Sequence, residues 1–107
     1  MIWGTTPDFT FQIKNQNVDL SEANNVYVSF TQNETEIIKS GNDLEIDGRT
    51  VSVWLTQEES MRLKNGKFFE VQINWTYLAL DGVTVRRAAT KPKAIPVEKQ
   101  LLKRVIE

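Results

Sequence analysis

The chain has 107 residues, of which 40% are apolar and 25% are charged, and its formal net charge is −1. It contains neither cysteine nor histidine, which excludes disulfides, Cys-type zinc sites and hydrolytic triads of the Ser–His or Cys–His type. Carboxylate chemistry is not excluded, and one domain of this length can bury a core. We therefore expect a single noncatalytic domain without a cofactor.

Short segments of alternating apolar and polar residues, separated by polar turns, predict an antiparallel β-sandwich. Residues 8–14 place Phe9, Phe11 and Ile13 on one side, as in a half-buried strand. Residues 25–31 alternate in the same way and predict a second strand.

The next two segments predict a further strand and a hairpin. Residues 35–40 contain Ile37 and Ile38 in succession, which cannot both face inward, so we expect this strand to be short or bulged. Residues 43–56 form two alternating runs around the dipeptide Asp47-Gly48, which predicts a type I′ turn.

A helical turn and the longest strand follow. Thr56 and Glu59 match a capping box, which predicts a helical turn over residues 56–63. Residues 67–78 predict a central strand with large apolar side chains on the face that points to the core. The side chains expected inside it are Phe69, Val71, Ile73, Trp75 and Tyr77.

Two shorter strands are predicted next. Residues 82–90 alternate with Val83 and Val85 inward, and prolines in and before residues 94–97 indicate an edge strand there. Residues 1–97 would then form the sandwich.

The last residues, 98–107, have helical spacing and predict an amphipathic helix or tail whose apolar stripe needs a surface to cover. The exposed apolar residues of this segment are candidates for partner binding. They are Leu101, Leu102, Val105 and Ile106.

Two groups of acidic residues are weak candidates for a catalytic or metal-binding site. Glu58 and Glu59 are adjacent on the predicted helical turn and diverge by about 100°, so capping is favoured over catalysis. Asp43, Glu45 and Asp47 lie on one side of a strand and present oxygens to a cation, but the other ligands of a calcium loop are absent. A solvated strand face is favoured, and we assign no catalytic, cofactor-binding or metal-binding residue.

Basic residues gather at the carboxyl end. Residues 1–85 hold six basic and twelve acidic side chains, whereas residues 86–107 hold seven basic and two acidic ones. Aromatic residues are absent from the basic stretch, which disfavours single-stranded nucleic acid. Contact with a protein partner, or pairing with the acidic body of the chain, is favoured instead, and Arg86 and Arg87 are candidates for partner binding.

Two tryptophans are also candidates for partner binding. Trp54 lies on the opposite face of its predicted strand from Val53 and Leu55, and Trp3 precedes the first strand. An exposed Trp would mark an interface or a sugar-stacking platform, but cover by a loop or by the C-terminal helix is the favoured interpretation.

No apolar run approaches a membrane span, and the first residues lack the basic and apolar regions of a signal peptide. We therefore expect neither membrane insertion nor secretion by that route.

Several motifs also carry a resemblance. The opening Gly4–Pro7, the turn Leu55–Glu59 and the strand segment Val71–Ile73 resemble small proteins encoded in phages and prophages of Gram-positive bacteria. Those proteins are similar in layout to the immunoglobulin-like N-terminal domain of phage baseplate upper proteins. The match runs from Gly4 to about Val97, and Ser60-Met61 departs from it.

The resemblance implies an immunoglobulin-like antiparallel β-sandwich of about seven strands, with a short helical turn and a C-terminal helix or tail. It implies a noncatalytic structural role in a tail, baseplate or neck, with protein partners and a possible homo-oligomer, in the virion or in the host cytoplasm during assembly. Two alternatives stay open. One is a carbohydrate-binding module of a receptor-recognition device, and the other is a prophage regulator that binds a host protein.

Overall fold

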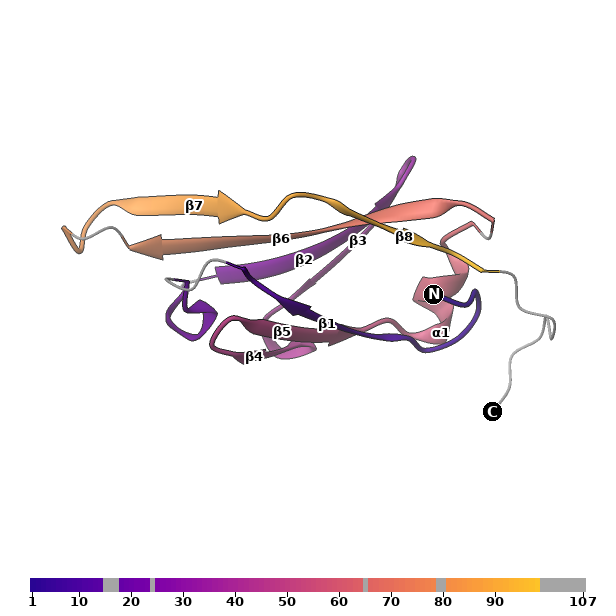
Figure 1. The fold of residues 1–107 in the computed structure, drawn as a ribbon, viewed down its shortest axis with the longest axis horizontal. Helices are drawn as coiled ribbons and strands as arrows, with labels where there is room; N and C mark the ends of the chain where they lie inside the picture. Colours follow the sequence, from indigo (N-terminus) through magenta and orange to yellow (C-terminus); the bar gives the residue numbers. More distant parts are fainter. Residues whose placement is uncertain (15–17, 24, 65, 79–80, 99–107) are drawn as a thin grey trace.

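The computed structural model describes residues 1–14, 18–23, 25–64, 66–78 and 81–98. Within these ranges two antiparallel sheets lie face to face, which makes the fold an all-β sandwich (Figure 1). The small sheet has the order β1-β5-β4, with β1 at Asp8–Gln12, β4 at Leu44–Asp47 and β5 at Thr50–Trp54.

The large sheet has the order β3-β2-β6-β7, and β8 pairs with β6 beyond the end of β7. Its strands are β2 (Asn25–Gln32), β3 (Thr35–Ser40), β6 (Phe68–Leu78), β7 (Val85–Ala89) and β8 (Lys93–Pro96). The short helices are η1 (Leu20–Glu22), η2 (Gly41–Asp43) and α1 (Gln57–Met61). The described part thus has eight strands, one more than expected.

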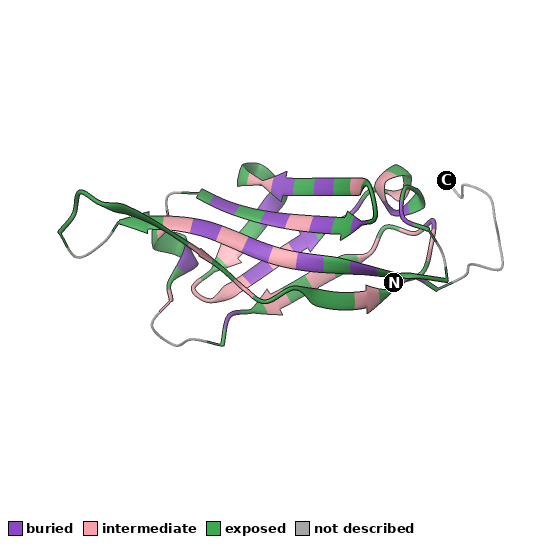
Figure 2. Cartoon of the chain, turned by 90° about the horizontal axis from the view of Figure 1, so that it is seen from above, coloured by how far each residue is buried: buried purple, intermediate pink, exposed green. Residues whose placement is uncertain are grey.

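The core forms where the two sheets present their alternate side chains to each other. Along β2 and β6 buried and exposed residues alternate, as their sequence parity predicts (Figure 2). Phe9 of β1 reaches Phe30 of β2 and Phe69 of β6, with ring centroids 5.5 and 6.1 Å away. Trp75 is also buried, so most of the predicted inner face of β6 is confirmed.

One local prediction is narrowed and another is wrong. Ile37 is buried and Ile38 is exposed, and β3 pairs with β2 in an unbroken register over six residues, so of the two expected forms the strand is short and not bulged. In the β4–β5 hairpin Asp47 pairs with Thr50, which leaves Gly48 and its successor as the two central residues. Gly48 alone has positive φ (60°), as in a type II′ turn.

The edge strand near residue 94 is confirmed, because β8 pairs with β6 and with no other strand among the described residues. Beyond it, the backbone of Glu98 donates to Met1 and accepts from Trp3, so the chain stays tied to the first residues as far as position 98. The predicted helix or tail at 98–107 lies outside the described residues from position 99 on.

The hairpin of β6 and β7 extends past the β4–β5 turn, so its far end has no small sheet beneath it (Figure 1). Three inward predictions are wrong. Tyr77 lies past the end of that layer, Val85 pairs with Leu78 and so faces the outer side of the large sheet, and Val83 lies before β7 begins. Tyr77, Val83 and Val85 are exposed to 38%, 81% and 54%. Parity placed Tyr77 on the inner face of the strand, but the layer that would bury it ends before that point. We call residues 77–78 and 81–86 the β6–β7 arm.

Candidate interaction surfaces

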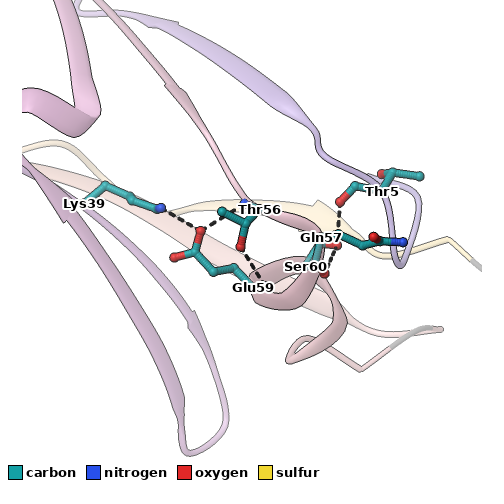
Figure 3. Close-up of polar contacts among 6 residues, drawn as sticks. All are labelled: Thr5, Lys39, Thr56, Gln57, Glu59 and Ser60. Atoms are coloured by element: carbon teal, nitrogen blue, oxygen red, sulfur yellow. Dashed lines mark hydrogen bonds and ion pairs between the residues drawn. The ribbon is translucent and has the colours of Figure 1, made fainter. Parts of the chain in front are cut away.

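The predicted capping box is confirmed and accounts for Glu59. The hydroxyl of Thr56 accepts from the Glu59 N–H, and Glu59 Oε1 accepts from the Thr56 N–H at 2.9 Å (Figure 3). Lys39 Nζ lies 2.6 Å from the same oxygen. Burial opposes ionisation of Glu59, yet the hydrogen bonds from Lys39 and Thr56 and the charge of Lys39 together lower its pKa. This carboxylate therefore joins β3 to α1.

Replacing Glu59 with glutamine should reduce stability near neutral pH by about 1–3 kcal/mol, because an amide keeps the cap but not the charged contact with Lys39. A lowered folded pKa contributes stability above the ordinary value of 4.5, and this contribution is lost as the pH falls through the folded pKa. The difference in melting temperature between the two proteins should therefore shrink on acidification. A difference that stays constant with pH would contradict this role.

The same helical turn is fastened to the N-terminal segment. Ser60 is fully buried, and its hydroxyl lies 2.6 Å from the carbonyl oxygen of Thr5 and 3.0 Å from that of Gln57 (Figure 3). The adjacent Glu58 is exposed. Glu59 is engaged in the cap and Ser60 in bonds to the N-terminal segment, so these contacts hold the helical turn in place.

The other acidic candidates belong to two elements. Asp43 ends η2, so its predicted place on the strand is wrong, whereas Glu45 and Asp47 lie on β4. Asp43, Glu45 and Asp47 are all exposed. Among the residues that the structure describes, no group of three or more carboxylates is placed to hold a metal ion.

The two tryptophans differ in exposure. Trp54 is 43% exposed at the end of β5, opposite Asp8 of β1, so the expectation that it is covered is wrong. Trp3 is half-buried and packs against the core. Its backbone N–H donates to Glu98. Trp54 therefore stays a candidate contact residue, and Trp3 belongs mainly to the fold.

The basic residues are divided between two faces. Arg86 lies opposite Tyr77 and Arg87 opposite Thr76, so their side chains leave β7 on opposite sides of the large sheet. Lys91 and Lys93 follow on the crossing from β7 to β8 and are exposed. The remaining basic residues of the stretch, and the apolar candidates Leu101, Leu102, Val105 and Ile106, lie outside the described residues.

The β6–β7 arm gathers exposed apolar side chains that sequence reasoning assigned to the core or did not single out. Leu78 and Val85 are cross-strand partners, exposed to 51% and 54%. Tyr77, on the other face of the sheet, and Val83 are also exposed on the arm. Apolar residues clustered at the end of a projecting hairpin are typical of a contact surface.

The turn of the arm is held by one carboxylate. Asp81 accepts hydrogen bonds from the backbone N–H groups of Thr84 and Val83 and from the Thr84 hydroxyl. Those bonds, led by the Thr84 backbone, lower the pKa of Asp81 to about 2. These bonds join Asp81 to the residues that lead into β7.

A groove of about 760 Å³ opens between β1 and the crossing from β7 to β8. Its apolar lining includes Phe11, Ile13, Ile73 and Trp75. The described residues that line it include three lysines and no carboxylate; the lysines are Lys14, Lys91 and Lys93. No sequence signal indicates this groove, because it depends on which strands become neighbours.

Comparison of the chain with family models, curated proteins and solved structures gave no match. In the described part of the chain no helix is long and apolar enough to cross a membrane.

Proposed function

We propose that this chain is a noncatalytic structural protein of a phage or prophage, an immunoglobulin-like sandwich that acts through protein contacts in a tail, baseplate or neck. The observation that carries the proposal is the β6–β7 arm, which projects from the sandwich and exposes apolar side chains at its end. The resemblance of Gly4–Pro7 and Leu55–Glu59 to phage and prophage proteins supports the assignment to a phage or prophage.

The arm is suited to contact in two respects. Its backbone is paired through Leu78 and Val85, and Asp81 bonds to the residues that lead into β7, so these residues lose less conformational entropy when a partner orders them. It also presents Tyr77 next to Arg86, two residue types that are enriched at the energetic centres of interfaces.

The test is incorporation of the chain into particles purified after induction of a prophage that carries its gene. The variant Leu78→Thr with Val85→Thr should reduce incorporation by about tenfold, because both residues lie on the exposed arm. The matched control is Tyr27→Thr with Ile38→Thr, which removes two equally exposed apolar residues of β2 and β3. Absence of the wild-type chain from purified particles, or equal losses in both variants, would refute the proposal.

A second candidate function has one observation in its favour. Trp54 is exposed on the outer face of the small sheet, opposite Asp8 and two residues from Ser52, which is the setting that a sugar-stacking platform needs. A glycan array would test it. Binding that is lost in Trp54→Ala and kept in the Leu78→Thr, Val85→Thr variant would favour a carbohydrate-binding module over the structural role.

A further inference from the structure

The edge of β1 that faces away from β5 carries backbone groups without partners. The Pro7 carbonyl accepts from Leu55 and the Ile13 N–H donates to Arg49, so the odd-numbered residues of this segment point toward β5. Because successive residues alternate, the N–H and C=O groups of Thr10 and Gln12 point to the other side. In the described ranges these groups have no hydrogen-bond partner.

The groove lies at that edge. Thr10 and Gln12 line it together with Phe11, which lies between them and contributes an apolar side chain. On the opposite wall Ile73 and Trp75 of β6 continue the apolar lining. A free strand edge beside an apolar groove is the arrangement to which an extended polypeptide adds as a further strand.

After its charged first residue, Asp8, β1 lacks the charged residues and prolines that usually protect a sheet edge. From Phe9 to Gln12 it contains no charged residue and no proline. The other edge of the same sheet, β4, carries the exposed carboxylates Glu45 and Asp47. The contrast marks β1 as the edge that can accept a strand.

The charges around the groove indicate which side chains an added strand would carry. Lys14, Lys91 and Lys93 line it, with no carboxylate among the described lining residues. Apolar side chains of an added strand would enter the groove at every second residue, and acidic side chains between them would meet the lysines.

We propose that an extended segment of a partner protein, with apolar and acidic side chains in alternation, docks in this groove and adds to β1 as a fourth strand of the small sheet. The inference rests on the proposed function only in that the chain works through protein contacts. It concerns a different surface from the β6–β7 arm.

The probe is a synthetic peptide of about seven residues in which Val and Ile alternate with Glu, a length that spans β1. It should bind with a dissociation constant below about 1 mM and slow hydrogen exchange of the Thr10 and Gln12 amides, measured by NMR. Two control peptides should bind at least about tenfold more weakly. One has Lys in place of Glu, and the other is N-methylated at alternate amides.

A substitution at Thr10 isolates the backbone contact. Thr10→Pro removes an outward N–H that no strand of the small sheet uses, so the protein should fold and lose about tenfold in peptide affinity. The hydroxyl of Thr10 also lies 3.2 Å from that of Ser52. The variant Thr10→Val therefore serves as the matched control, because it removes this contact but keeps the N–H, and it should bind as the wild type does.

The lysines are tested by Lys91→Glu with Lys93→Glu, against Lys64→Glu with Lys67→Glu, an equal change of charge at exposed residues that do not line the groove. The first should weaken peptide binding by about tenfold and the second should not.

Three outcomes would overturn the inference. They are no binding of the acidic peptide, equal binding of the N-methylated peptide, and protection of Thr10 and Gln12 that rises with protein concentration alone. The last outcome would identify a second copy as the occupant. Each leaves the particle-incorporation experiment unaffected, since that experiment changes Leu78 and Val85, so failure here is distinguishable from failure of the proposed function.

Discussion

Replacing Phe30 with alanine should lower the free energy of unfolding by about 3–5 kcal/mol. Phe30 is fully buried, and its ring lies 5.5 Å from that of Phe9 and 6.0 Å from that of Phe69. Phe9 belongs to the small sheet and the other two belong to the large one, so the substitution opens a cavity at the contact between the two layers. Urea unfolding followed by tryptophan fluorescence would measure the change.

The matched control is Tyr27→Ala on the same strand, where the side chain is 41% exposed and the loss should stay below about 1 kcal/mol. Domains of this size have about 5–15 kcal/mol of stability in total, so Phe30→Ala can unfold part of the population. Phe30→Leu then provides a milder variant with a smaller loss. Equal effects of Phe30→Ala and Tyr27→Ala would contradict the assignment of this aromatic cluster to the centre of the core.

The strands were predictable from sequence because a half-buried strand must alternate, and alternation is visible without any knowledge of its neighbours. β2 and β6 show this most clearly, with buried and exposed positions where parity places them. The capping box of Thr56 and Glu59 was predictable for the same reason, since every group in it lies within four residues.

The alternation of side chains along a strand does not show where the opposite sheet of the sandwich ends. Tyr77 has the spacing of a core residue, but the small sheet turns back at Gly48 before it reaches this side chain. Trp54 illustrates the reverse case. Its outward parity was visible in the sequence, whereas its 43% exposure depends on how the described segments pack around it.

The groove and the free edge of β1 were beyond sequence reasoning for a topological reason. They arise because β1 stands at one end of its sheet while the crossing from β7 to β8, about eighty residues later, passes opposite it. Lys14 and Lys93 show the same limitation. Each looked like an ordinary surface lysine, and only the fold brings both to one groove.

Gln32 is a buried polar residue that sequence reasoning placed at a turn. Its side chain is held on both sides, since Oε1 accepts from the Lys64 N–H at 2.6 Å and Nε2 donates to the carbonyls of Lys64 and Phe68. The residue is only 5% exposed. It thus joins the end of β2 to the segment that leads into β6, and its partners lie more than thirty residues away in the chain.

Gln32→Ala should therefore cost about 1–3 kcal/mol, because it leaves one N–H and two carbonyl groups of Lys64 and Phe68 without this partner in a partly buried place. Thr31→Ala, at the exposed neighbouring position, should change stability by less than about 1 kcal/mol.

Gln32→Glu gives the sharper test. Ionised, it keeps the acceptor but loses the donor and buries a charge, whereas protonated glutamic acid regains one donor. Burial raises the pKa of such a carboxyl, so the stability of the variant relative to wild type should rise as the pH falls. A deficit that does not change between neutral and acidic pH would show that the side chain of Gln32 fills space without bonding to the loop.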